Sequence, residues 1–275
     1  MQIEMRTLET THFEDAERYS SYLKTSLGRL RSELAWENLR GVLPADAPRW
    51  RVLDLGGGTG SMSLRLAKAG FPVVLLDSSE EMLGIARKEA EACGSAARIS
   101  FLHGEASRLQ ELFAAESFDL VVCHNLLEYV ADPEAIVAKI AHVVRNDAVV
   151  SVLVRNRAGE VLRATIKSAD GTFAKATLSA ETAVDSLYGK PVRVFDPQVV
   201  IDMLARAGLD VIAQRGVRVF SDYREPKDLE DEAAYQQVLE LELLLGARPE
   251  FAGIARYMQL IARRSSLCAK KVDVR

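Results

Sequence analysis

The sequence predicts an α/β protein with a Rossmann-like, mostly parallel sheet of seven strands and helices on both faces. Two observations support this prediction. Between residues 50 and 154, short apolar runs alternate with amphipathic segments, which is typical of repeated β-α-β units. The first apolar run also ends in a cluster of glycines, as expected where a buried strand turns tightly into a helix.

The N-terminal segment is expected to be helical. Leucines recur at spacings of three to five residues across 26–42 and predict one apolar face. Pro44 and Pro48 then end this helix. We interpret residues 1–48 as an N-terminal helical lid that folds over a bound ligand.

The central segment is expected to supply five strands and three helices. The strands should cover residues 51–55, 72–76, 99–103, 118–123 and 148–154. The helices should cover residues 61–69, 79–93 and 133–144, and the second should be capped by Ser78 or Ser79.

The alternation stops after Arg155. Residues 158–194 contain several glycines and no clear strand periodicity, so we expect a cap insertion over the carboxyl edge of the sheet. A helix over 197–208, a strand over 209–214, a charged helix over 229–245 and a final antiparallel strand over 254–263 should follow. Residues 49–275 would then form one domain that includes this cap.

Composition excludes several classes of protein. Hydrophobic residues make up 48% of the 275 residues and charged residues 27%, which is ordinary for a globular protein. No apolar run approaches the ~20 residues that span a bilayer, and the start lacks the basic-then-apolar pattern of a secretory signal. We therefore expect a cytoplasmic protein without a membrane partner.

Charge and metal-binding residues give mostly negative indications. The net charge of −4 gives no overall support for nucleic-acid binding, although a local basic patch remains possible. The three cysteines form no C-x-x-C pair, and the four histidines lack metal-ligand spacing. We expect neither a metal site nor a redox dithiol.

A glycine-rich turn should follow the first strand directly. The glycines at 56, 58 and 60 give the spacing G-x-G-x-G after Asp54. Glycine lets backbone approach a ligand without intervening Cβ atoms, although such a turn can also be purely structural. Dinucleotide sites have G-x-G-x-x-G, and P-loops have a Lys-Ser/Thr pair, neither of which occurs here. The turn is instead similar to the first motif of class I S-adenosylmethionine-dependent methyltransferases.

Asp77 ends the second expected strand, seventeen positions after Gly60. At this place in an open α/β sheet, a carboxylate can accept hydrogen bonds from both ribose hydroxyls of an adenosine-containing cofactor. The same side chain could instead cap the helix that begins near Ser79. The two functions are compatible with each other.

Further segments resemble one family, the bacterial tRNA 5-carboxymethoxyuridine methyltransferases. The resemblance extends from about Phe13 to Arg263. Its most specific blocks are His124-Asn125-Leu126-Leu127-Glu128-Tyr129-Val130-Ala131-Asp132-Pro133 and Gly216-Val217-Arg218-Val219-Phe220-Ser221-Asp222-Tyr223. It also includes Gly28-Arg29-Leu30-Arg31 with Trp36, Leu239-Glu240-Leu241-Glu242 and Ala255-Arg256-Tyr257.

The resemblance implies a set of cofactor-binding residues for S-adenosyl-L-methionine. With the glycine turn, the expected set is Arg31, Asp54, Gly56, Gly57, Gly58, Gly60, Asp77, Ala106, Ser107 and His124. Arg31 would pair with the cofactor carboxylate, although it could also be a solvated helix residue. Asp77 would bind the ribose, residues 106–107 would lie beside the adenine, and His124 would lie near the methionine part or the methyl group.

The methyl acceptor is less defined. The resemblance implies methylation of the carboxylate of 5-carboxymethoxyuridine in tRNA. A carboxylate is ionised at neutral pH, because its pKa lies near ~4, so no general base would be needed. It would need a cationic partner, for which Arg157, Arg218 and Arg256 are candidates. For a hydroxyl or amine acceptor, His124 could act as a base, and Tyr223 is a further candidate for a substrate contact.

Three functions therefore remain open. The first is a tRNA carboxyl methyltransferase, and the second is a small-molecule O- or N-methyltransferase of the same fold. The third, a nicotinamide-dependent oxidoreductase, is disfavoured by the glycine spacing. The cap weakens the case for tRNA, since its basic residues are interspersed with acidic ones: Lys167, Lys175, Lys190 and Arg193 among Asp170, Glu181 and Asp185.

Overall fold

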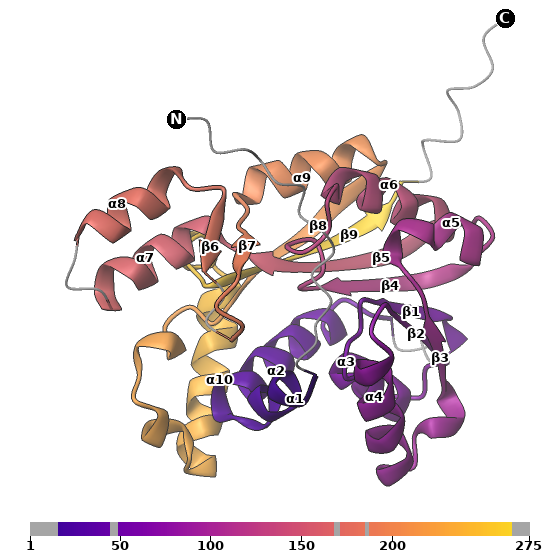
Figure 1. Cartoon of the computed structure of the whole chain (residues 1–275), viewed down its shortest axis with the longest axis horizontal. Coiled ribbons are helices and arrows are strands. Elements are labelled where there is room, and N and C mark those ends of the chain that lie inside the picture. Colours follow the sequence, from indigo (N-terminus) through magenta and orange to yellow (C-terminus); the bar gives the residue numbers. More distant parts are fainter. Residues whose placement is uncertain (1–15, 45–48, 168–170, 185–186, 266–275) are drawn as a thin grey trace, which may run out of the picture.

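A seven-stranded sheet is the centre of the molecule (Figure 1). The computed structural model describes residues 16–44, 49–167, 171–184 and 187–265. The strand order is β3-β2-β1-β4-β5-β9-β8, and only β9 is antiparallel to its neighbours. The strands are β1 (Val52–Leu55), β2 (Val73–Asp77), β3 (Ile99–His103), β4 (Phe118–His124), β5 (Val144–Arg155), β8 (Leu209–Val217) and β9 (Tyr257–Arg264). The predicted fold class is confirmed.

Helices cover both faces of this sheet (Figure 1). One face packs against α2 (Ser26–Arg40), α3 (Ser61–Lys68), α4 (Glu80–Ala92) and α10 (Glu232–Gly246). The other face packs against α5 (Leu109–Leu112), α6 (Pro133–Val143) and α9 (Pro197–Arg206). The short α11 (Pro249–Ala252) precedes β9.

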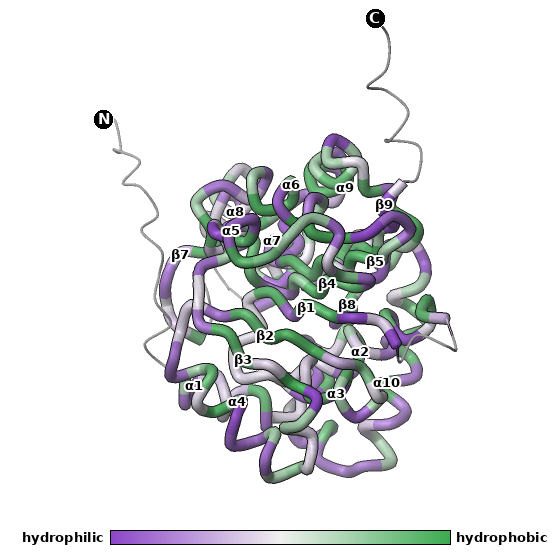
Figure 2. The backbone as a smooth tube through the Cα atoms, turned by 90° about the vertical axis from the view of Figure 1, so that its right-hand side faces the viewer, coloured by the Kyte–Doolittle hydropathy of each residue, from purple (hydrophilic) through white to green (hydrophobic). Residues whose placement is uncertain are grey.

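The central strands are buried on both faces. Leu120 and Val122 of β4 contribute to one core cluster, whereas Val121 and Cys123 contribute to the other. This alternation follows from the two-residue period of a strand, and it explains why the central strands are continuous apolar runs. Figure 2 shows these apolar segments in the middle of the molecule, with more polar segments around them.

The N-terminal region consists of α1 (Ala16–Lys24) and α2, and they differ in burial. The predicted leucine face of α2 is confirmed, since Leu30, Leu34 and Leu39 are fully buried against the sheet. Helix α1 packs on α2 and α4 and has one buried residue, Ala16. Residues 1–15 and 45–48 of the expected lid lie outside the described part of the chain.

The cap after β5 is more regular than its sequence indicated. It contains α7 (Arg157–Lys167), α8 (Gly171–Ser179) and a hairpin of β6 (Thr182–Val184) and β7 (Pro191–Arg193). Gly159, which looked like a loop residue, lies within α7. A Cβ at this position would stand 2.2 Å from the carbonyl oxygen of Ala255, so the close approach of the two backbones requires a glycine. Close packing, not a turn, accounts for this glycine. Within the described residues, no helix is long and apolar enough to span a membrane.

Candidate functional site

Three adjoining hollows lie at the carboxyl edge of β1, β2, β4 and β5, where open α/β sheets bind ligands. The turn hollow is bordered by Arg31 and Gly57. The β3 hollow is bordered by residues 104–107. The arginine hollow is bordered by Arg155 and Arg256, together with aromatic side chains from α1 and β9.

The glycine turn has the conformation that its sequence predicts. Gly56, Gly58 and Gly60 all have positive φ, at 68°, 55° and 80°, which glycine adopts without strain. A Cβ on Gly57 would stand 2.9 Å from the carboxylate of Asp54. Three successive glycines after Leu55, at positions 56–58, thus leave backbone facing the hollows, which fits a ligand that is bound by main-chain groups.

Asp54, near the end of β1, links the glycine turn to α3. Its Oδ2 accepts hydrogen bonds from the backbone N–H of Ser63, at 3.0 Å, and from the Ser63 hydroxyl, at 2.6 Å. Asp54 is buried, and burial raises the pKa of its carboxyl to about 6. The carboxylate also borders the turn hollow, so it connects the first strand, the turn and α3.

Asp77 lies where two hollows meet, at the end of β2. Its Oδ2 accepts from the N–H of Gly58 at 2.8 Å, and its Oδ1 accepts from the N–H of Ser79 at 2.9 Å. Burial raises the pKa of its carboxyl. The cap of α4 is Ser79, whose hydroxyl accepts from the N–H of Met82 at 3.2 Å. The alternative in which Asp77 is itself the helix cap is therefore wrong.

Arg31 points from α2 into an aromatic enclosure. Its Nη2 donates to the hydroxyl of Tyr19 at 2.9 Å. The guanidinium lies 5.1 Å from the ring centre of Tyr22 and 5.7 Å from those of Tyr19 and Tyr257. It borders both the turn hollow and the arginine hollow, so it is not a solvated helix residue.

His124 borders the same two hollows but is poorly suited to accept a proton. Its Nε2 lies 2.8 Å from the hydroxyl of Ser151, which accepts a hydrogen bond from Gln259 Nε2 at 3.0 Å. The Ser151 hydroxyl proton can therefore be donated to Nε2. Burial, together with the charge of Arg31, lowers the pKa of His124 to about 3. The imidazole is neutral at neutral pH.

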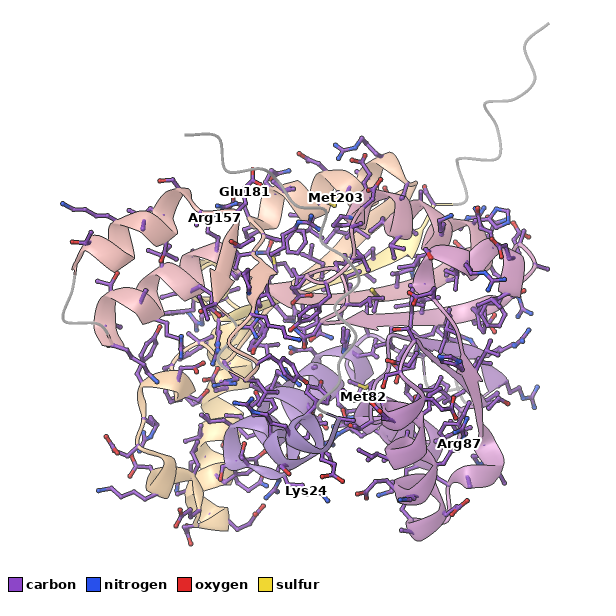
Figure 3. The ribbon with its side chains drawn as sticks, in the orientation of Figure 1. Lys24, Met82, Arg87, Arg157, Glu181 and Met203 are labelled. Carbon is purple, nitrogen blue, oxygen red and sulfur yellow. The ribbon has the colours of Figure 1, made fainter. Side chains whose placement is uncertain are left out.

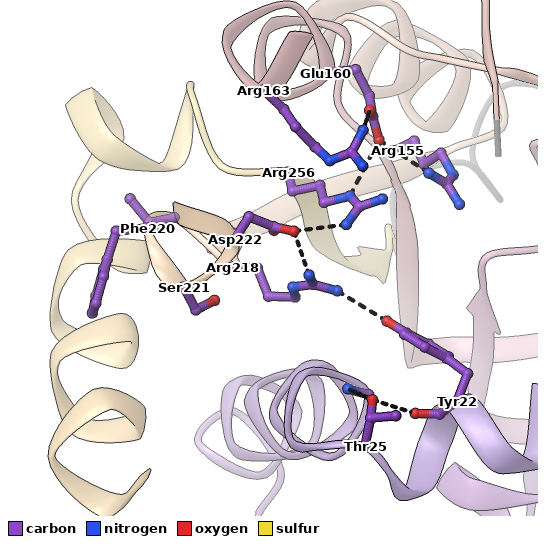
Figure 4. Close-up of polar contacts among 12 residues, drawn as sticks. Tyr22, Thr25, Arg155, Glu160, Arg163, Arg218, Phe220, Ser221, Asp222 and Arg256 are labelled. Atoms are coloured by element: carbon purple, nitrogen blue, oxygen red, sulfur yellow. Dashed lines mark hydrogen bonds and ion pairs between the residues drawn. The ribbon is translucent and has the colours of Figure 1, made fainter. Parts of the chain in front are cut away.

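A buried ionic network lies behind the arginine hollow (Figure 4). Glu160 Oε1 accepts from Arg155 at 3.0 Å and from Arg256 at 3.3 Å. Asp222 Oδ1 accepts from Arg256 at 2.7 Å and also from Arg218. All five side chains have exposed fractions of 8% or less. The network connects cap helix α7 with the end of β5, the segment after β8 and the residue before β9.

Two further contacts extend this network. Arg218 Nη1 donates to the hydroxyl of Tyr22 at 2.9 Å, which links the network to α1. Arg163 Nη1 lies 3.7 Å from Glu160 Oε2. Figure 4 shows both, so helices that are distant in sequence meet at one set of charges.

Tyr257 stands at the centre of the arginines. Four guanidinium carbons lie between 5.5 and 5.9 Å from its ring centre, and they belong to Arg31, Arg155, Arg218 and Arg256. Burial alone would raise the pKa of Tyr257, but these cations outweigh it and lower the pKa to about 8. The local field therefore favours an anion.

The sequence-predicted residues divide into two groups by position. Those that border the hollows are Arg31, Asp54, Gly56, Gly57, Gly58, Asp77, Ala106, Ser107, His124 and Arg256. Arg218 lies in the network behind them, and Gly60 is the N-cap of α3. Arg157 instead pairs with Asp196 at 3.0 Å, on the cap where Figure 3 labels it beside Glu181. Neither it nor Tyr223 borders these hollows.

Sequence reasoning missed several residues that border the hollows, and five of them are polar or aromatic side chains at the arginine hollow. They are Tyr19, Tyr22, Asn125, Arg155 and Tyr257. Arg155 and Asn125 could have been found, because each stands at the carboxyl end of a predicted strand. The tyrosines carried no such signal. In the described part of the chain, no group of three His, Cys, Asp or Glu side chains could hold a metal ion.

The sheet order, the antiparallel β9, the glycine turn and Asp77 together define a class I S-adenosylmethionine-dependent methyltransferase. A family profile described as a methyltransferase domain matches residues 52–147. An S-adenosylmethionine-dependent methyltransferase structure from Thermotoga maritima is similar, with a TM-score of 0.60 and 17% identity, over 90% of this chain and 96% of that one. One from Mesorhizobium loti has a TM-score of 0.57 and 19% identity, over 84% and 98%.

The chain belongs to the family of the tRNA 5-carboxymethoxyuridine methyltransferases. It is 30% identical to the Escherichia coli K12 protein of that name over 261 residues, which is 94% of this chain and 97% of that protein. It is also 36% identical over 173 residues to a ubiquinone biosynthesis O-methyltransferase from Rhizobium rhizogenes, covering 61% of this chain and 62% of that protein. S-adenosylmethionine is the cofactor.

Proposed function

We propose that this enzyme methylates the carboxylate of 5-carboxymethoxyuridine in tRNA. The supporting observation is the charge of the buried network beside the arginine hollow. Three buried arginines, Arg155, Arg218 and Arg256, and the partly exposed Arg163 pair with the carboxylates of Glu160 and Asp222. The positive field of these arginines lowers the pKa of the buried Tyr257 to about 8, and the same field favours a ligand with a negative group.

The two ends of the site would then recognise two different carboxylates. Arg31, at the turn hollow, would bind the carboxylate of the cofactor. Arg155 and Arg256, across the ring of Tyr257, would bind the carboxylate of the acceptor. The β3 hollow, with Ala106 and Ser107, would receive the adenine.

Asp77 would bind the ribose, with the glycine turn against the methionine part. Its two oxygens already accept from backbone donors, and each has a further lone pair that could accept from a ribose hydroxyl. Helix α1 would act as the lid, since Tyr19 and Tyr22 border the arginine hollow. The cap would cover the acceptor, because Glu160 of α7 anchors Arg155 and Arg256.

The reaction depends on alignment of the two reacting groups and on exclusion of water more than on proton transfer. S-adenosylmethionine supplies an electrophilic methyl group when it is bound. An acceptor carboxylate oxygen would bond to that carbon as the sulfur–carbon bond broke, which would give a methyl ester and S-adenosylhomocysteine without moving a proton. The chain's own residues would align the carboxylate and exclude water. A neutral His124 with low basicity is compatible with this chemistry.

Small-molecule methylation is the second candidate. The partial identity to a ubiquinone biosynthesis O-methyltransferase and the net charge of −4 favour it. A hydroxyl acceptor usually needs a base, however, and His124 has its Nε2 beside Ser151 and a pKa of about 3. These features disfavour hydroxyl chemistry at His124.

Mass spectrometry of tRNA nucleosides tests the proposal. Bulk tRNA from cells that lack the enzyme would be incubated with the enzyme and labelled S-adenosylmethionine, and label should appear in the methyl ester of 5-carboxymethoxyuridine. The same tRNA without the carboxymethoxy group should remain unlabelled. Absence of label at low salt, with intact cofactor binding, would contradict the tRNA proposal.

Matched arginine variants sharpen this test. Arg256→Gln should raise the acceptor KM at least tenfold, because a bidentate pair is lost. Arg157→Gln, on the cap and outside the hollows, should leave the KM within twofold. Equal effects of the two substitutions would contradict recognition by the arginine hollow.

A further inference from the structure

The three hollows meet at one place. Of the described residues that border them, only Gly56 and Asn125 belong to all three. Gly56 has no side chain, so Asn125 supplies the single side chain at the junction. This position has a chemical counterpart in the cofactor. The sulfonium is the atom at which the methionine part, the adenosyl part and the transferable methyl group are joined.

The backbone of Asn125 is fixed in an uncommon conformation. Its φ of 54° lies in the left-handed region, which asparagine tolerates better than most residues. Its N–H donates to the carbonyl of Leu153 at 2.7 Å, which ties it to β5. The residue therefore leaves β4 sharply and stands at the cleft with little freedom to move.

The amide of Asn125 has a defined orientation. Its Nδ2 donates at 3.0 Å to Oε1 of Glu128, a residue with an exposed fraction of 1%. The same Oε1 accepts from the N–H of Arg155 at 2.9 Å. An oxygen that accepts two hydrogen bonds requires the nitrogen side of the asparagine amide to face it.

Protonation of Glu128 would not reverse this orientation. Burial raises the pKa of Glu128, and its Oε2 has no hydrogen-bond partner in the described part of the protein. A proton would reside on Oε2, and Oε1 would still accept. The carbonyl oxygen Oδ1 of Asn125 is consequently left on the other side, and no described residue donates a hydrogen bond to it.

We propose that Oδ1 of Asn125 faces the sulfonium of bound S-adenosylmethionine and stabilises its positive charge. An amide oxygen carries the negative end of a dipole, and the carbon–hydrogen bonds next to a sulfonium are polarised enough to act as weak donors. Asn125 is thus a cofactor-discriminating residue. Its contact exists with the charged substrate and weakens with the neutral product, S-adenosylhomocysteine, which favours product release.

Calorimetric titration with three ligands tests this inference without a methyl acceptor. The ligands are S-adenosylmethionine, neutral S-adenosylhomocysteine and sinefungin, which carries an ammonium group near the position of the sulfonium. Asn125→Gly removes the side chain but suits the positive φ. It should weaken binding of the two cationic ligands by about three- to tenfold and that of S-adenosylhomocysteine by less than twofold, as expected for one weak polar contact.

Asp77→Asn is the matched control. This substitution alters the same cofactor site away from the sulfonium, and we expect it to weaken the binding of all three ligands by the same factor. A common factor for all three in Asn125→Gly, or no change in any, would overturn the inference. Asn125→Leu provides a second variant of similar size, for which the same selective loss is expected. Because no acceptor is present, these results do not depend on whether the substrate is tRNA.

Discussion

The cofactor side and the acceptor side of this cleft are built in different ways. The cofactor side draws mainly on residues 54–107, with backbone N–H groups and glycines around two carboxylates. The acceptor side gathers buried arginines and acids from α7, β5 and the ends of β8 and β9. The cofactor side depends on a local turn, whereas the acceptor side depends on contacts between segments that are distant in the sequence.

This difference has an energetic consequence. A turn stabilised by backbone hydrogen bonds tolerates the loss of one side chain, because its conformation is fixed by the chain itself. A network of alternating buried charges does not, since removing one member leaves its partner charged and unpaired. We therefore expect substitutions on the cofactor side to affect ligand binding and substitutions in the network to affect folding as well.

The largest expected effect is on folding. Asp222→Ala leaves Arg218 and Arg256 without their shared acid, and it should lower the free energy of unfolding by about 3–5 kcal/mol. Asp228 is a matched control, because it pairs with Arg224 at the same i,i+4 spacing but its side chain is 35% exposed. Asp228→Ala should cost less than ~1 kcal/mol. Denaturant titration measures the free energy of unfolding of both variants. Similar decreases in the two variants would contradict the special contribution of the buried network to folding.

Acid should destabilise the protein through His124. Its pKa of about 3 in the folded state lies below the unfolded value near ~6.5, so the unfolded chain binds more protons between these pH values. Stability should fall as the pH drops from about 6.5 toward 3, by roughly 4 kcal/mol. His124→Gln should flatten this dependence, and the exposed His142→Gln should not. An unchanged pH dependence in His124→Gln would contradict the buried, neutral imidazole.

The cofactor side is tested by ligand-induced stabilisation. S-adenosylhomocysteine at 100 times its Kd should stabilise the protein by roughly 2.7 kcal/mol, and Asp77→Ala should lose most of this. Asp119→Ala, at the opposite edge of the sheet beside Arg145, should keep the full response. Melting temperatures with and without ligand provide the measurement. A full response in Asp77→Ala would show that the ribose is bound elsewhere.

Arg31 lies at the boundary between the two sides. Arg31→Lys should weaken cofactor binding by about tenfold, because an ammonium cannot reproduce a planar two-point contact with a carboxylate. Arg29→Lys, on the same helix but paired with exposed Glu232, should change the affinity by less than twofold. Calorimetry measures the cofactor affinity of both variants. Unaltered affinity in Arg31→Lys would assign this arginine to the acceptor side instead.

The smallest expected effect concerns tRNA contacts on the cap. The affinity for tRNA should fall with salt, with a slope of about −0.7 to −0.9 for each neutralised phosphate. Combined Lys167→Glu and Lys175→Glu should reduce that slope by one or two such contacts while leaving cofactor affinity unchanged. Lys68→Glu, on α3, should not alter it. A flat salt dependence in the unsubstituted enzyme would favour a small-molecule acceptor.

The sequence by itself determined the parallel sheet, the glycine turn and the acid at the end of β2. Each is a local pattern, because strand burial, positive φ and strand-end position are properties of neighbouring residues. The resemblance added Arg31 and His124, which local patterns alone did not identify. The cap was predicted but its regular structure was missed, since Gly159 within α7 and Gly171 at the start of α8 also read as loop signals.

Only the tertiary structure decided which arginines share a site. Arg155, Arg218 and Arg256 lie up to a hundred positions apart and meet because β9 inserts between β5 and β8. The position of β9 also places Tyr257 beside Arg31. Arg157, in contrast, lies on the cap and pairs with Asp196. A charged side chain has no periodicity that reveals its partner. Its function depends on burial and on neighbouring charges, which exist only once the sheet has formed.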